Sequence, residues 1–305
     1  MHRRDFLAVL PGVTLLKAGD TDVTVERFRS GKPHAGKVLA AIQPHADDIP
    51  LFAAGTVAKL LEEGYSGYLI RTTNDDMAGR GSVGETVLAN ERDNDRLVQV
   101  MGLKRGFDLN YLNHRMDGVS PVEIRIRLIF LFRLLRVDTV ISYDPWGHYE
   151  ENPDHYVTAQ QVEAACWMAG MDNDYPEQFA AGLKPKSVTE KYYFARGPQL
   201  VNRVVDITSV VEKKIDAILV NVAQGPGGDN GKLLRQRLAR EGKRLPILGD
   251  DDTTANREYA RQFLLARDRE TGRKYGVQYA EPFHYIGPEA DEVGEYIKRN
   301  AVPAR

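Results

Sequence analysis

Cysteine is almost absent from this chain, since Cys166 is the only one among 305 residues. A single cysteine excludes an intrachain disulfide framework and any zinc cluster built on several cysteines. Cys166 stands in a helix-forming stretch, residues 162–167, where we expect a buried structural thiol and not a nucleophile. Any metal that this chain binds must therefore be held by histidine and carboxylate side chains.

An excess of charge of one sign is also missing. The chain has 41 basic and 43 acidic residues and a formal net charge of −2, which gives no bias toward nucleic acid or an anionic membrane. No stretch approaches the roughly 20 uncharged apolar residues that a membrane-spanning helix needs. The most apolar helical stretch, residues 124–135, contains three arginines, so we expect a core helix there.

The N-terminal 30 residues are interpreted separately. Arg3 and Arg4 precede a short apolar segment, residues 6–16, and the arrangement resembles a twin-arginine export signal. Lys17 follows closely and no Ala-x-Ala cleavage pattern appears, so an ordinary exposed extension explains the same residues. We expect an exported, periplasmic protein, with a cytoplasmic one as the alternative, and a single domain over residues 31–305.

Strand-like and helix-like patterns alternate over the first two-thirds of the chain. Short apolar or β-branched runs are each followed by a stretch with helical periodicity. The strand-like runs are residues 38–42, 68–73, 108–112 and 138–143. With 42% apolar residues, the chain can bury the core of one large domain. The alternation predicts an α/β fold with a Rossmann-like parallel sheet and helices on both faces.

The last third is less regular and is best described as a C-terminal elaboration of the same domain. Its strand-like runs are residues 188–195, 201–206 and 280–286, and its helical stretches are residues 208–223 and 254–269. Between the helices, residues 225–252 are rich in glycine and charge, which indicates an irregular insertion around a short helix. The Gly-Pro-Gly-Gly run at residues 225–228 is not a phosphate-binding loop, because no Lys-Ser/Thr pair follows at the needed spacing.

The most informative motif lies where the first strand-like run ends, at Pro44-His45-Ala46-Asp47-Asp48. Open α/β sheets place their sites in the loops that leave the carboxyl ends of strands. The fourth run ends in a loop that leads to Asn152-Pro153-Asp154-His155, and the two loops are expected at the same edge. His45, Asp48 and His155 would then reach one ion, in a two-histidine, one-carboxylate set that suits zinc. Helix capping by either aspartate, and a surface histidine at a helix start, are the ordinary alternatives.

These two segments resemble the motifs of the PIG-L/LmbE-like zinc de-N-acetylases. The family's first motif, Pro-His-x-Asp-Asp, is matched in full at residues 44–48. Its second motif, His-Pro-Asp-His, is matched at residues 152–155, with Asn152 in place of the first histidine. Two motifs in the right order are more specific than either alone. The resemblance covers residues 37–200 well and the remainder loosely.

The resemblance implies a zinc-dependent hydrolase that removes an acetyl group from an N-acetylated amino sugar or glycoconjugate. His45, Asp48 and His155 would hold zinc or another divalent ion, and Asp47 would be the general base that takes a proton from the activated water. The ion would stabilise the oxyanion that forms on the acetamide carbonyl. Asp154 would either cap its helix or orient a liganding histidine.

Asn152 is the departure from the family pattern with the largest consequence. An asparagine can donate a hydrogen bond to an oxyanion but cannot transfer a proton at neutral pH. The acid role must therefore move to another group, or Asp47 must serve as both base and acid. His148 and His284 are the candidate substitutes, and each is also explained as a partly buried histidine bonded to backbone.

The substrate-binding candidates lie on a helix and on a loop between the two motifs. Arg92, with Asp95 three residues on, is similar to the family's Arg-x-x-Glu helix, although such charges usually form a solvated helix face. Asp75, Asp76 and Arg80 stand in the Gly-rich loop after the second strand-like run, where binding of substrate hydroxyls competes with ordinary turn chemistry.

Two rival functions follow from the same residues. Asn152 makes a catalytically altered, carbohydrate-binding member of the same fold conceivable. A Rossmann-type nucleotide-binding enzyme is disfavoured, because no Gly-x-Gly-x-x-Gly follows the first strand-like run. The sequence does not fix the acyl group, the sugar or the oligomeric state.

Overall fold

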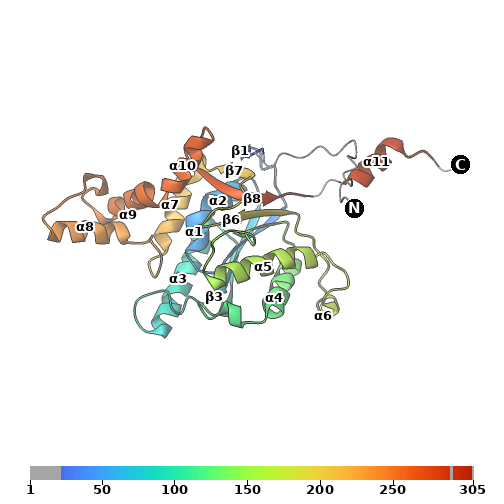
Figure 1. The fold of residues 1–305 in the computed structure, drawn as a ribbon, viewed down its shortest axis with the longest axis horizontal. Coiled ribbons are helices and arrows are strands. Elements are labelled where there is room, and N and C mark those ends of the chain that lie inside the picture. Colours follow the sequence, from blue (N-terminus) through green and yellow to red (C-terminus); the bar gives the residue numbers. More distant parts are fainter. Residues whose placement is uncertain (1–21, 289–290, 304–305) are drawn as a thin grey trace, which may run out of the picture.

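An eight-stranded mixed sheet forms the centre of the molecule (Figure 1) in a computed structural model, which describes residues 22–288 and 291–303. The strand order across the sheet is β1-β7-β8-β6-β5-β2-β3-β4. The strands are β1 (Thr24–Glu26), β2 (Val38–Gln43), β3 (Ser66–Thr73), β4 (Arg105–Tyr111), β5 (Thr139–Tyr143), β6 (Glu190–Phe194), β7 (Arg203–Asp206) and β8 (Ala280–Ile286).

Helices lie on both faces of this sheet, as the alternation predicted. Single turns of 3-10 helix (Met116–Gly118, Thr208–Val210, Pro246–Leu248) and one π-helical turn (Ala260–Leu264) join them. The helices are α1 (Asp48–Phe52), α2 (Ala54–Glu62), α3 (Val83–Met101), α4 (Pro121–Leu135), α5 (Pro153–Met168), α6 (Pro176–Ala180), α7 (Val211–Val220), α8 (Asn230–Arg240), α9 (Asp252–Tyr259), α10 (Ala266–Lys274) and α11 (Glu292–Asn300).

The α/β fold class is confirmed, but the sheet is not wholly parallel. The pairs from β6 through β4, and the pair of β1 with β7, run parallel. Strand β8 runs antiparallel between β6 and β7. The periodicity of residues 280–286 could not reveal this direction. The direction of a strand depends on the end of the sheet at which the preceding helix, here α10, ends.

Alternation along the central strand β2 divides the core in two. Leu39 and Ala41 point to one face and pack in the cluster that holds α1, α2, α3 and α7. Ala40 and Ile42 point to the other face and pack in the cluster that holds α4 and α5. Because successive side chains of a strand alternate between its two faces, the continuous apolar run of residues 38–42 is typical of a strand that is covered on both faces.

Local sequence signals explain where the longer helices begin and end. Ser82 and Glu85 form a reciprocal capping box at the start of α3, and Gly102 ends that helix in the left-handed conformation. The expected helix after the first motif is split at Ala53 into α1 and α2. The expected helix over residues 254–269 is divided by the π-helical turn into α9 and α10.

Three further predictions concern the cysteine, a membrane-spanning helix and the export signal. Cys166 is buried in α5, and burial raises the pKa of its thiol, as expected for a structural cysteine. Within the two described ranges, no helix combines the length and apolar character needed to cross a bilayer. The twin-arginine-like residues lie in the segment 1–21, outside the described residues.

Candidate metal centre

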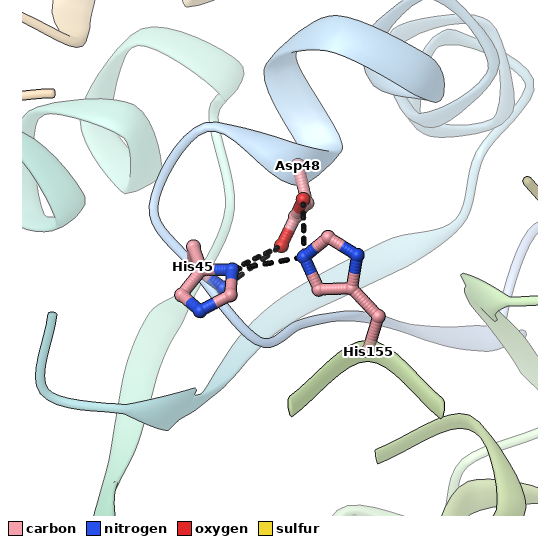
Figure 2. A group of neighbouring side chains, drawn as sticks. All are labelled: His45, Asp48 and His155. Carbon is pink, nitrogen blue, oxygen red and sulfur yellow. Dashed lines mark hydrogen bonds and ion pairs between the residues drawn. The ribbon is translucent and has the colours of Figure 1, made fainter. Parts of the chain in front are cut away.

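The two motifs meet because their strands are neighbours in the sheet. β2 and β5 pair in parallel, so the loops at their carboxyl ends leave the same edge. His45 lies in the loop after β2, Asp48 is the first residue of α1, and His155 lies in the first turn of α5. Figure 2 shows the three side chains pointing toward one another.

The distances among these side chains fit one small metal ion. His45 Nδ1 lies 3.0 Å from His155 Nε2 and 3.5 Å from Asp48 Oδ2. His155 Nε2 lies 3.6 Å from Asp48 Oδ1. Two nitrogens bound tetrahedrally to one zinc at ~2.0–2.1 Å would lie about 3.3 Å apart. All three residues are buried, and buried imidazole and carboxylate ligands are a donor set typical of zinc.

In each histidine, the ring nitrogen that points away from the other two ligands lies beside a carboxylate. His45 Nε2 lies 3.0 Å from Asp154 Oδ2, and Asp154 also accepts hydrogen bonds from the backbone N–H groups of His114 and Met116. His155 Nδ1 lies 3.1 Å from Glu150 Oε1. Such partners fix the orientation of liganding histidines. The helix cap of α5 is Asn152 and not Asp154, so the Asp154 carboxylate is free to orient His45.

The electrostatics of the group favour an ionised Asp48. Burial alone would raise its pKa, but the nearby His155 and His45 imidazoles lower the pKa of Asp48 to about 2. Tyr143 donates a 2.7 Å hydrogen bond to Asp48 Oδ1 and stacks on the His155 ring at 4.2 Å. Burial lowers the pKa of His45, yet the carboxylates of Asp154 and Asp48 outweigh it and raise that pKa well above its ordinary value.

Asp47 is close to the three ligands but is not tied to the helix. It occupies the N-cap position of α1, yet its side chain makes no capping hydrogen bond. Burial and the neighbouring Asp48 carboxylate raise the pKa of Asp47 to about 7. A half-buried carboxyl with this pKa can take up and release a proton near neutrality.

Asn152 also reaches the centre. Its Oδ1 accepts the N–H of Asp154 as the cap of α5, which leaves its Nδ2 facing the ligand nitrogen of His155 at 3.4 Å. An amide donor is therefore present beside the ligand atoms, at the position where the family has histidine.

The structure places the two substitute histidines differently. His284 on β8 lies beside Asp144, with 3.3 Å between Nδ1 and Oδ2, and against the Trp146 ring. His148 is exposed, and its ring lies against Tyr149. Among the described residues, neither histidine forms a hydrogen bond or a ring contact with the three ligand side chains. Asp144, the partner of His284, directly follows β5.

The predicted substrate-binding residues separate into exposed and buried ones. Arg92 and Arg80 are exposed, and Asp76 accepts the N–H of Asn113. Asp75 does not lie at the rim, because it is fully buried beneath the first motif. It accepts the Ala46 N–H and a hydrogen bond from the buried guanidinium of Arg71, so it supports the loop that carries His45.

The sequence did not predict that residues 221–225, the loop after α7, pack against the first motif. Asp93 on α3 accepts the backbone N–H groups of Val222 and Ala223. Asn221 donates to the Ala46 carbonyl, and a Cβ added at Gly225 would lie only 2.6 Å from Asp47 Oδ2. No spacing rule links residues some 175 positions apart. His114 was also missed, and its ring nitrogens lie near His45 and Asp154.

A buried two-histidine, one-carboxylate group at the carboxyl edge of parallel strands defines an α/β protein with a mononuclear metal-type centre. The PIG-L family profile, described as GlcNAc-PI de-N-acetylase, matches residues 40–166, which include both motifs. Over this part of the chain, the resemblance to the PIG-L family that the motifs predicted is therefore confirmed.

Similarity to individual proteins extends beyond the matched region. The chain is similar to the diacetylchitobiose deacetylase of Thermococcus kodakarensis, with 28% identity over 194 residues, which are 62% of this chain and 71% of that protein. Its fold is similar to the N,N'-diacetylchitobiose deacetylase from Pyrococcus horikoshii (24% identity, TM-score 0.66, 82% of this chain and 84% of that one). It is also similar to GalB, the 4-carboxy-2-hydroxymuconate hydratase of Pseudomonas putida (18% identity, TM-score 0.60, 84% and 98%).

Proposed function

We propose that this chain is a metal-dependent hydrolase that removes the acetyl group from an N-acetylated amino sugar or a similar glycoconjugate, with zinc as the ion. The observation that carries the proposal is that His45, Asp48 and His155 converge on one point. Asp47 lies next to them in the chain, and its carboxyl makes no capping hydrogen bond to the helix. The similarity to a protein described as a diacetylchitobiose deacetylase supports an acetamido sugar as the substrate class.

Different groups carry out the successive steps of amide hydrolysis. When bound, a divalent ion would supply Lewis acidity at the acyl carbonyl. The Asp47 carboxylate accepts a proton from the attacking water as its oxygen bonds to the acyl carbon. The same carboxyl then returns that proton to the departing amine as the C–N bond breaks, so the products are acetate and a free amino sugar. A pKa of about 7 suits Asp47 to both steps.

Asn152 supplies the hydrogen bond that the missing histidine would otherwise donate. Its Nδ2 already faces the ligand nitrogen of His155, next to the place where an oxyanion would form. Because an amide cannot release a proton, this assignment requires Asp47 to act as both base and acid. His284, with its Asp144 partner, is the alternative proton donor.

The fold alone does not choose the reaction, since a protein described as a hydratase shares it. Purified, zinc-loaded protein should be incubated with acetamido sugars, and released acetate and free amine should be measured together. Equal amounts of both products are expected, and Asp47→Asn should abolish them. Saturable sugar binding without either product would instead indicate the carbohydrate-binding alternative that Asn152 suggests.

A further inference from the structure

Helix α4 carries apolar side chains on its outward side as well as on the side that faces the core. Its sequence, PVEIRIRLIFLFRLL, places Ile124, Leu128 and Phe132 in the cluster between the sheet and α5. A surface helix normally keeps its apolar side chains on the side that faces the core. The apolar side chains on the outward side of α4 therefore lack their usual cover within the part of the chain that the structure describes.

The outward side carries an apolar stripe at intervals of four residues. Val122, Phe130 and Leu134 are exposed to 50%, 40% and 47%, and Ile126 between them is half-buried. Residues 122–134 span about 18 Å of helix at 1.5 Å per residue. Single exposed apolar side chains are ordinary, but a contiguous stripe marks an interaction site.

An apolar groove adjoins this stripe and extends it to the edge of the sheet. The groove has a volume of about 630 Å³ and lies between α4 and β4, with Phe107 and Leu109 on the strand and Ile126 and Phe130 on the helix. β4 is the last strand at its end of the sheet, so no strand of the described chain covers its outer edge. Figure 1 shows α4 beside α5, with α6 nearby at the same side of the molecule.

The charges at the rim of the groove indicate which kind of partner would bind there. Arg105 and Arg127 stand there together with Asp108 and Glu177. Asp108 already pairs with Arg71, and Arg127 already pairs with Glu123, so the charges left for a partner are one of each sign. Arg105 and Glu177 are exposed and form no ion pair with any residue that the structure describes. A two-fold contact places the same patch against itself in reverse. A patch of mixed sign can then pair its charges, whereas a patch of one sign would repel its copy.

We propose that the outward face of α4 and the groove beside β4 form a two-fold interface with a second copy of this chain. The apolar stripe supplies the buried centre of the interface, and the mixed charges supply its polar rim. This pattern of an apolar centre and a polar rim is the usual anatomy of protein–protein interfaces. The interface lies on the face of the sheet that α4 covers, and it uses none of the residues assigned to the metal centre.

The test is the mass of the full chain in solution, measured by light scattering after size exclusion over a range of micromolar concentrations. The wild-type protein should show the mass of two 34.2 kDa chains. Phe130→Glu combined with Leu134→Glu should raise the dissociation constant ~100-fold or more, because two charges would enter the apolar centre. Circular dichroism should be unchanged, since both side chains are exposed.

Two control variants make the result specific. Leu88→Glu places the same substitution at a similarly exposed position on α3 and should leave the dimer intact. Tyr296→Glu with Ile297→Glu changes the other exposed apolar helix, α11, and should also leave it intact. A wild-type monomer at every concentration, a dimer that survives in the α4 variant, or a dimer lost only in the α11 variant would overturn the proposal.

Discussion

Asp47 and Asp48 show how far two adjacent, chemically identical side chains can diverge. Asp48 is fixed by Tyr143, His45 and His155, which hold its pKa at about 2. Asp47 lacks these partners, and its pKa is raised to about 7. Environments that separate the pKa values of two carboxyls suit them to different roles, which supports the proposal that Asp48 is a ligand and Asp47 a proton carrier.

Amide substitutions should separate these roles. Asp47→Asn keeps the shape of the side chain but cannot accept a proton, so turnover should fall by roughly 10²–10⁴-fold while metal content stays near one ion per chain. Asp48→Asn and His155→Ala should lower metal content and turnover together. Metal analysis and acetate release on the same preparations decide the matter. If Asp47→Asn loses its metal and keeps its turnover, the two roles are reversed.

The depressed pKa of Asp48 also predicts how the metal-free protein responds to acid. In the unfolded chain Asp48 takes up its proton near pH 3.8, but in the folded chain only near pH 2. The stability that Asp48 contributes is therefore complete above its unfolded pKa and is lost as the pH falls toward 2. Urea unfolding between pH 5 and pH 2 should show a shallower decline in Asp48→Asn than in the wild type.

At the scale of elements, the candidate metal centre adjoins a loop from the last third of the sequence. The residues after α7 are held on α3 by Asp93 and lie against the first motif through Asn221 and Gly225. The last third of the chain is therefore part of the site.

Gly225 allows a matched test of that arrangement. Gly225→Ala would bring a Cβ to 2.6 Å from the Asp47 carboxylate at a φ of +77°, so Asp47 should be displaced and turnover should fall with metal content retained. Gly242→Ala is the control, because its φ of +66° gives similar backbone strain while its Cβ meets nothing within 4 Å. Equal turnover in the two variants would show that the contact with Asp47 has no consequence.

Buried charges join the remaining helices to the sheet. Lys214 on α7 is fully buried and lies 2.6 Å from Asp268 on α10 and 2.8 Å from Glu281 on β8. Glu281 also accepts the N–H groups of Gly55 and Thr56 on α2. One ammonium group thus bridges two buried carboxylates where four elements meet.

Loss of that ammonium group should be costly. Lys214→Met leaves two buried carboxylates without their partner, and the free energy of unfolding should fall by roughly 3–5 kcal/mol. Lys213→Met, at the exposed neighbouring position, should change it by less than about 0.5 kcal/mol. Urea denaturation of both variants tests this; a similar small effect in both would mean that the buried carboxylates are satisfied without Lys214.

At the scale of the whole molecule, the sequence of the N-terminal segment leads to a proposal about localisation. We propose that residues 1–30 direct twin-arginine-dependent export, because Arg3 and Arg4 precede the apolar residues 6–16. A reporter fused to these residues should be translocated, and Arg3→Lys with Arg4→Lys should block translocation. A reporter that stays in the cytoplasm with the native segment would refute export.

The sequence by itself determined the α/β class, most of the strands and the three metal-ligand candidates. Continuous apolar runs such as residues 38–42 indicate buried parallel strands, and motif residues at strand ends fall at one edge of a parallel sheet. These inferences succeed because they depend on local periodicity and on a general rule of sheet topology.

Only the tertiary structure decided which groups surround those ligands. The antiparallel direction of β8, the burial of Asp75, the Asp154 contact with His45 and the position of Gly225 over Asp47 all depend on contacts between segments distant along the chain. Local patterns carry no information about such contacts, because a carboxylate or a glycine has the same sequence signal whether it caps a turn or supports a site. The packing of the helices against the sheet makes that distinction.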